Sequence, residues 1–133
     1  MIYPEKCRRP ARKRQNMMLP YPVPLNRAYR NFRGRIVMSA EARAWKESAA
    51  WQAHFHFSVV LDGPVWVNLV LHPKITKTGT ASKTRIDLDS IFKLTLDALN
   101  GIAYHDDKQI ERLIAEIGPP GEGGGLSVMV GKL

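Results

Sequence analysis

The sequence predicts one α+β domain, a mixed sheet with two main helices, and three observations support this. The chain has 133 residues, the size of a single domain. Its composition, 44% hydrophobic and 24% charged, is typical of a globular protein. Segments with strand and helix periodicity alternate, with Gly and Pro between them. We expect residues 1–13 to form a disordered basic extension and residues 14–133 to form the domain.

The first elements are a strand, a connector and a hairpin. Residues 14–19 favour a strand. The prolines of residues 20–24 exclude a helix or a central strand, so this run predicts an extended connector that ends at Leu25-Asn26. Gly34 lies between two basic segments and predicts a short hairpin within residues 27–38.

A long helix is predicted next, over residues 40–57. Ser39 is placed to cap it, and Glu41 lies in the first turn, where the helix dipole favours a negative charge. Residues at helical spacing form its buried stripe: Ala42, Trp45, Ala49 and Ala53. We also expect the other two tryptophans, Trp51 and Trp66, to lie in the core.

The second half predicts a strand, a loop, a helix and two more strands. Apolar residues alternate over residues 65–72, a strand, and a Lys- and Gly-containing loop follows at 73–85. A helix over residues 88–99 has an apolar face of Leu88, Phe92, Leu96 and Leu99. Strands at 109–117 and 126–130 flank a glycine-rich segment, which we expect to be a hairpin loop.

The charge is divided unevenly along the chain. The formal net charge is +8, but residues 1–50 hold 12 Lys and Arg against three acidic residues, a net of +9. Residues 51–133 hold eight basic and nine acidic residues, a net of −1. The basic half suggests a polyanionic partner such as nucleic acid. A lone cysteine, Cys7, excludes a disulfide framework. Without a membrane-length apolar run or a secretory apolar region, we expect a cytoplasmic protein.

Acidic residues gather in the near-neutral half. Asp87 and Asp89 are two residues apart and project to the same side of an extended chain, and Lys93 follows one helical turn after Asp89. Asp106-Asp107 opens the next segment. Clustered carboxylates repel one another unless a divalent cation lies between them, and their hard oxygens suit Mg²⁺. A site of this kind hydrolyses phosphodiesters, with a lysine stabilising the charge of the transition state.

The same residues also have a simpler interpretation. Asp-x-Asp before a helix commonly caps it, and Asp89, Lys93 and Asp97 form an ordinary solvated ladder at four-residue spacing. On that interpretation the protein binds nucleic acid without cutting it, as a phage accessory factor would. A third hypothesis is a metal-dependent phosphohydrolase that acts on free nucleotides.

Two blocks of sequence carry a family resemblance. The first contains Leu19-Pro20-Tyr21-Pro22, Asn26, Tyr29-Arg30, Arg33-Gly34-Arg35 and Ser39-Ala40-Glu41. The second contains Asp87-Leu88-Asp89, Lys93, Asp97-Ala98-Leu99 and Asp106-Asp107. In this order and spacing, the two blocks resemble the RusA family of Holliday-junction resolvases across nearly all of the chain beyond the extension.

The resemblance implies a homodimeric, prophage-type crossover junction endodeoxyribonuclease of DNA recombination and repair, which depends on Mg²⁺ or, as a substitute, Mn²⁺. An enzyme of this family makes paired incisions in a four-way junction and needs neither a membrane nor an organic cofactor. The family's metal-binding acids match Asp87, Asp89 and Asp107, with Asp106 as the alternate, and its functional lysine matches Lys93. The expected DNA contacts are Asn26, Arg27, Tyr29, Arg30, Arg33, Arg35, Lys74, Lys77, Lys83 and Arg85.

Overall fold

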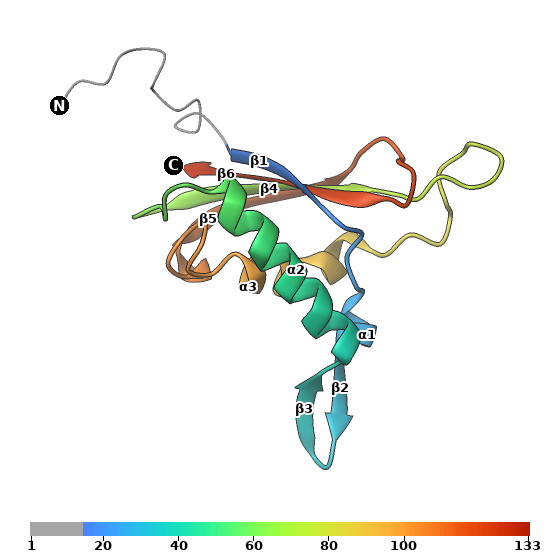
Figure 1. Cartoon of the computed structure of the whole chain (residues 1–133), viewed down its shortest axis with the longest axis horizontal. Coiled ribbons are helices and arrows are strands. Elements are labelled where there is room, and N and C mark those ends of the chain that lie inside the picture. The colour runs from blue at the N-terminus through green and yellow to red at the C-terminus, as the bar shows by residue number, and fades with distance from the viewer. Residues whose placement is uncertain (1–14) are drawn as a thin grey trace.

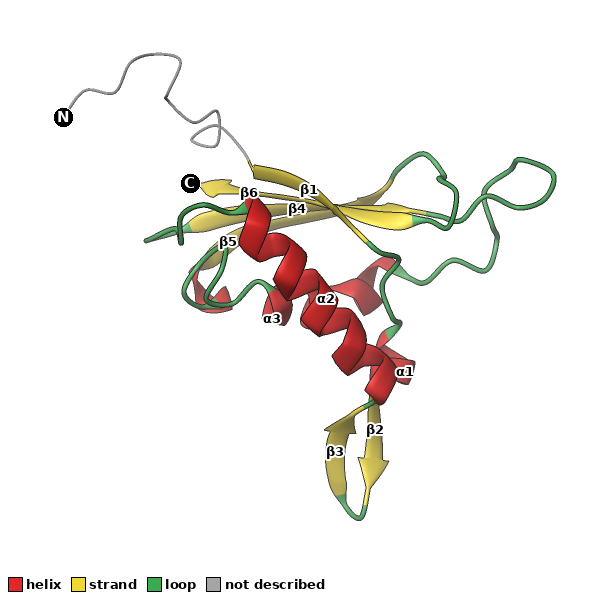
Figure 2. Ribbon diagram, viewed as in Figure 1, coloured by secondary structure: helices red, strands yellow, loops and turns green. Residues whose placement is uncertain are grey.

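A two-layer arrangement of sheet and helices forms the domain. The structure is a computed structural model that describes residues 15–133, so the extension expected at residues 1–13 lies outside the described residues. Within the described range, helices cover one face of a four-stranded mixed sheet, and a two-stranded hairpin projects from the helical layer (Figure 1). The other face of the sheet carries no helix of the described residues (Figure 2). The predicted α+β fold class is therefore confirmed.

The elements follow the predicted order closely. The strands are β1 (Gln15–Leu19), β2 (Tyr29–Phe32), β3 (Arg35–Met38), β4 (Val65–His72), β5 (Ile110–Ile117) and β6 (Gly125–Lys132). The α-helices are α1 (Leu25–Ala28), α2 (Ala40–His56) and α3 (Phe92–Ala98). Two 3₁₀ turns, η3 (Leu88–Ile91) and η4 (Asp107–Gln109), precede α3 and β5.

The order of strands in the sheet is β1-β6-β4-β5, which corrects one expectation. β4 pairs antiparallel with β6 and parallel with β5, so the last two strands do not form a hairpin. The glycine-rich segment instead passes the end of β4, where Gly118 N donates to Leu71 O at 2.9 Å. Periodicity identifies strands but not their partners. The physical reason lies in composition: β5 carries charged residues that suit an edge, whereas β6 is largely buried and takes a central place.

The core lies between α2 and the sheet. The predicted stripe of α2 is confirmed, since all four of its residues are buried, and Ser39 Oγ accepts the capping bond from Ala42 N at 3.1 Å. Trp45 Nε1 donates to Pro20 O at 3.1 Å and so ties α2 to the connector. The inward residues of β4 complete the layer: Val65, Val67, Leu69 and Leu71.

Only one of the three tryptophans lies in the core. Trp51 is 66% exposed and packs against His54 and Phe55 on the outer side of α2, and Trp66 is half-buried on the bare face of the sheet. The expectation was wrong for Trp51 because it lies two residues after Ala49, on the opposite side of a helix with 3.6 residues per turn.

Two local predictions also needed correction. The extended connector ends at Pro24, and a short helix that was not predicted, α1, begins at Leu25. Pro24 O accepts hydrogen bonds from Arg27 N and Ala28 N, both at 2.9 Å. The helix predicted over residues 88–99 begins as the 3₁₀ turn η3. Because a 3₁₀ turn has three residues per turn, the expected stripe is rotated, and only Leu99 of its four residues is fully buried.

A helix that crosses a bilayer needs about 20 apolar residues. Across residues 15–133, no helix is both long and apolar enough to do so.

Candidate active site

One acidic segment of the site is the tight turn formed by Asp106 and η4. Asp106 caps η4, and its Oδ1 accepts a bond from Lys108 N at 2.9 Å. Gln109 completes the capping box, because its Oε1 accepts from His105 N at 2.7 Å and from Asp106 N at 3.0 Å. These bonds fix the backbone that carries both Asp106 and Asp107.

Gln109 also joins this turn to another part of the chain. Its Nε2 donates to Leu61 O at 2.9 Å and to Gly63 O at 2.8 Å, both in the segment before β4. Both donor and acceptor ends of the amide are thus occupied by backbone partners. The sequence analysis missed Gln109, although the Asp-x-x-Gln spacing of a capping box is readable at residues 106–109.

The two neighbouring aspartates shift each other's pKa in opposite directions. The pKa of Asp107 is raised, first by its hydrogen bond to the Asp106 side chain, then by partial burial and by the charges of Asp106 and Asp97. The pKa of Asp106 is lowered, mainly by the bond from Lys108 N and also by its bond to Asp107. The carboxylates of Asp97, Asp106 and Asp107 therefore form one electrostatic group, and Asp107 holds the proton more strongly than Asp106.

Lys93 lies beside this group. Its Nζ is 3.6 Å from Asp97 Oδ2, and its positive charge acts to lower the pKa of Asp107. The ammonium is also 5.8 Å from the centre of the Tyr29 ring. The pairing of Lys93 with Asp97 agrees with the predicted four-residue ladder, and the charge of Lys93 also acts on Asp107.

A buried tyrosine lies close to the acidic group. Tyr104 is fully buried and donates from its hydroxyl to Leu96 O at 2.8 Å. Burial raises the pKa of this tyrosine, and the charges of Asp107 and Asp97 raise it further. The phenol therefore stays neutral and fastens α3 to the start of the acidic turn.

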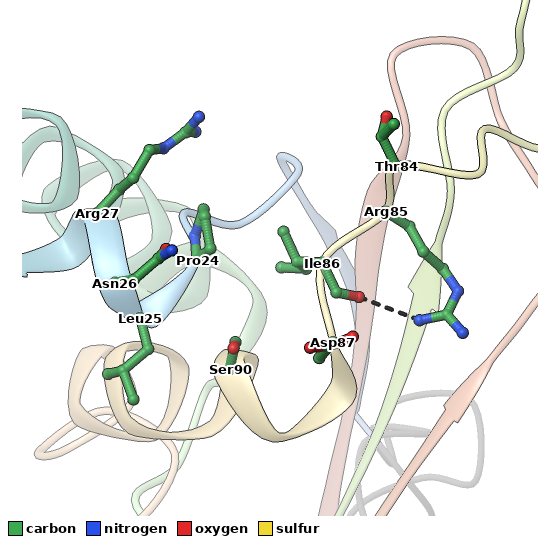
Figure 3. A pocket seen from close by; sticks show the side chains of 9 residues that line it. All are labelled: Pro24, Leu25, Asn26, Arg27, Thr84, Arg85, Ile86, Asp87 and Ser90. Atoms are coloured by element: carbon green, nitrogen blue, oxygen red, sulfur yellow. Dashed lines mark hydrogen bonds between the residues drawn. The ribbon is translucent and has the colours of Figure 1, made fainter.

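Asp87 lies in a different place, an open pocket of about 500 Å³ between α1 and the chain that leads into η3 (Figure 3). The pocket is lined by Pro24, Leu25, Asn26, Arg27, Thr84, Arg85, Ile86, Asp87 and Ser90. It brings Asp87 together with three of the predicted DNA-contacting residues, Asn26, Arg27 and Arg85. Arg85 Nη1 donates to Ile86 O at 3.2 Å, and Arg27 pairs with Glu41 at 3.0 Å.

The backbone next to Asp87 is held by Tyr21, which the sequence analysis did not place in this role. Ile86 N donates to the Tyr21 hydroxyl at 3.0 Å, and Lys74 Nζ lies 4.9 Å from the centre of the Tyr21 ring. No local sequence signal points to this contact, because Tyr21 and Ile86 lie 65 residues apart. Tyr21 thus connects the proline-rich connector, the basic loop and the acidic segment.

The predicted metal ligands do not all meet in the described conformation. Asp87 and Asp89 are exposed at the start of η3, whereas Asp107 lies in the turn before β5. Among residues 15–133, no three His, Cys, Asp or Glu side chains gather closely enough to hold a metal ion. The structure therefore brings Asp107 to Lys93, Asp97 and Asp106, and places Asp87 with the arginines of the pocket.

The remaining predicted DNA contacts lie on two projections, a hairpin and a loop (Figure 1). Tyr29, Arg30, Arg33 and Arg35 belong to the β2–β3 hairpin, with Arg33 at its turn in the left-handed region at a φ of 51°. Lys74, Lys77 and Lys83 belong to the loop after β4, and all three are exposed. These basic residues thus belong to other segments than the acidic ones, whereas Arg27 and Arg85 share the pocket of Asp87.

The chain matches known proteins over most of its length. The family model described as Endodeoxyribonuclease RusA matches residues 20–130. The crossover junction endodeoxyribonuclease RusA of Escherichia coli K12 is 28% identical over 120 residues, which are 89% of this chain and 94% of that protein. The protein of the same name from Enterobacteria phage 82 has the same identity and coverage.

Proposed function

The chain belongs to the endodeoxyribonuclease RusA family, and on this premise we propose that it cuts four-way DNA junctions by hydrolysing phosphodiester bonds in paired strands. The observation that carries the proposal is that the charge of Lys93 acts on Asp107, in a domain whose exposed cations lie on a projecting hairpin and a projecting loop. Resolution of such junctions would place the protein in DNA recombination and repair.

The basic projections supply the grip on the substrate. The hairpin residues Arg30, Arg33 and Arg35 and the loop residues Lys77 and Lys83 are exposed. Cationic side chains on separate projections contact phosphates of separate duplex arms, and such contacts carry affinity and not sequence preference. Two separate projections therefore suit a branched substrate, whose arms point in different directions, better than a single straight duplex.

Metal binding is the part of the proposal that rests on the chemistry of the donor set. The hydrogen bond with Asp106, partial burial and the charges of Asp106 and Asp97 raise the pKa of Asp107, and a divalent cation would offset the repulsion between these charges. We propose Asp107 together with Asp87 and Asp89 as ligands of Mg²⁺, with Mn²⁺ as a substitute and Asp106 as the alternate for Asp107. When bound, the cation would polarise the phosphodiester and lower the pKa of a water. This ligand set requires the segment of Asp87 and Asp89 to close on Asp107.

Lys93 has a separate role. Its ammonium is held near Asp97 and the Tyr29 ring, with its side chain 62% exposed and able to reach a phosphate. A positive charge there would stabilise the extra negative charge that develops on the phosphoryl group in the transition state. Asp97 would hold the lysine in place until substrate arrives.

A homodimer follows from the substrate. A four-way junction has two-fold symmetry, and cuts in two opposed strands are made most simply by two related active sites. We therefore propose that the active form contains two copies of this chain.

The proposal is tested with a synthetic four-way junction and a linear duplex of the same sequence, with and without Mg²⁺. Wild type should cut the junction in a Mg²⁺-dependent manner, and Asp87→Asn should bind it but lose cutting. Salt-sensitive binding without cutting would favour a DNA-binding accessory protein. Release of phosphate from free nucleotides without junction cutting would favour a nucleotide phosphohydrolase.

A further inference from the structure

The edge strand β5 carries an unusual group of exposed apolar residues. Leu113, Ile114 and Ile117 are 37%, 46% and 38% exposed, and all three belong to this one strand. In the described residues β5 pairs with β4 on one side, and no strand pairs with its other side. A long edge strand with exposed apolar side chains readily pairs with another strand.

The two faces of β5 follow from its register with β4. Leu113 pairs with Val67 and Ala115 with Leu69, so these residues lie on the helix-covered face with the buried side of β4. Arg112, Ile114 and Glu116 pair with Trp66, Asn68 and Val70, so they lie on the bare face. On the bare face the strand therefore reads basic, apolar, acidic, with equal spacing.

This order of charges is self-complementary about Ile114. We propose that β5 pairs antiparallel with β5 of a second copy of this chain, around a two-fold axis at Ile114. In that register Arg112 of each copy is opposite Glu116 of the other, and the two Ile114 side chains meet on the axis. On the other face Leu113 of each copy is opposite Ala115. The two sheets would then form one continuous sheet of eight strands.

Alternative registers are less favourable for geometric and electrostatic reasons. A shift of the axis by half a residue would oppose side chains that point to opposite faces of the sheet, which an antiparallel pair does not allow. A shift of the axis to Leu113 or Ala115 leaves Arg112 without an acidic partner across the strands. Opposite charges across an antiparallel pair stabilise it and like charges destabilise it, so the charges select the register centred on Ile114. This inference rests on the proposed function, which calls for two related active sites, and adds the surface that joins them.

Charge reversal tests the register directly. Arg112→Glu places a new carboxylate against Glu116 of the second copy at both symmetric positions, and Glu116→Arg places two guanidinium groups together there. Each single variant should raise the dimer dissociation constant at least about tenfold, measured by sedimentation at low salt. An equimolar mixture of the two variants restores opposite charges at both positions and should dimerise about as tightly as wild type. A variant that had merely lost its fold could not be rescued by the other.

A covalent trap provides the second test. Directly opposed residues of antiparallel strands have Cα atoms about 4.5–5.5 Å apart, which suits a disulfide. In a Cys7→Ser background, Ile114→Cys should form a disulfide-linked dimer with oxidised glutathione. The matched control Trp51→Cys, exposed on α2, should stay monomeric on a non-reducing gel.

Three results would overturn the interface: a wild type that remains monomeric at tens of micromolar, single charge variants that dimerise like wild type, or equal cross-linking of the Trp51→Cys control. The proposed function fails on a different measurement. If the interface variants behave as expected but wild type cuts no junction with Mg²⁺, the interface stands and the nuclease assignment does not. If wild type is monomeric and still cuts junctions, the nuclease assignment stands and the interface does not.

Discussion

The two acidic segments of the site are held in place in different ways. The turn that carries Asp106 and Asp107 is fixed by four hydrogen bonds of the Gln109 side chain and one of the Asp106 side chain. In the segment that carries Asp87, one long-range hydrogen bond, from Ile86 N to Tyr21, joins the backbone to the rest of the domain, and Ile86 and Leu88 pack against the core. The contrast teaches that the Asp107 half is preorganised by a hydrogen-bond network, whereas the Asp87 half is held mainly by apolar packing. Closure on a metal would therefore move Asp87 and not Asp107.

The largest expected effect separates the two adjacent aspartates. Asp107→Asn should lower the junction-cutting rate by at least about 100-fold, because the charge that binds the cation is worth several kcal/mol in the transition state. Asp106→Asn should retain cutting within about fivefold, since asparagine also caps a helix well. Single-turnover cleavage measures both. If Asp106→Asn is the inactive variant, Asp106 and not Asp107 is the ligand.

The second prediction removes the preorganisation of the Asp107 half. Gln109→Leu deletes the bonds to Leu61, Gly63, His105 and Asp106, and should destabilise the domain by about 1–3 kcal/mol. Cutting should fall about tenfold even at temperatures where the protein is fully folded, because Asp107 loses its fixed position. Urea unfolding and single-turnover cutting are measured on the same preparation. Full activity in a destabilised protein would show that the Gln109 bonds serve stability alone.

The third prediction loosens the Asp87 half. Tyr21→Phe removes only the hydroxyl that accepts from Ile86 N, at a cost of about 0.5–1.5 kcal/mol in stability. If this half already moves to close, cutting should fall no more than about threefold, and the Mg²⁺ concentration for half-maximal rate should change more than the maximal rate. A larger loss than in Gln109→Leu would reverse the comparison between the two halves.

The smallest effect is on pH dependence. The hydrogen bond and the charge of Asp106 raise the pKa of Asp107, so Asp107 stays protonated to a higher pH than an isolated aspartate. Cutting that requires ionised Asp107 is lost as the pH falls through this raised pKa. Asp106→Asn removes the charge, lowers the pKa of Asp107 and should shift the acid limb of the rate profile to lower pH. A shift of the acid limb to higher pH would contradict the inference that Asp106 raises the pKa of Asp107.

The sequence predicts local features better than long-range ones. The helix cap at Ser39, the buried stripe of α2 and the pairing of Lys93 with Asp97 all depend on neighbours within four residues, and all are confirmed. The strand order was not predictable in this way, because pairing is decided by which strand best fills the centre of the sheet. The Tyr21–Ile86 bond likewise joins segments that no periodicity relates.

The same limit applies to the candidate site. Residue types and spacing predicted a site from Asp87, Asp89 and the pair Asp106-Asp107, and the family resemblance selected Asp107. Spacing does not measure the distance between η3 and the turn before β5. That distance depends on α3, Tyr104 and Gln109, which separate the acidic segments. The exposure of the basic residues was easier to predict, because cations on a hairpin and a loop need no partner to position them.

The central position of β6 has a consequence for synthesis of the protein. β6 lies between β1 and β4, with Met17 opposite Val128, although it is the last strand of the chain. β1 and β4 emerge early, but the ladder between them cannot form until β6 has left the ribosome. From His72 to Lys132 this takes about 3–12 s at roughly 5–20 residues per second. During that interval the edge of β4 that β6 later covers has no partner, so the nascent chain exposes an unpaired strand edge until β6 is made.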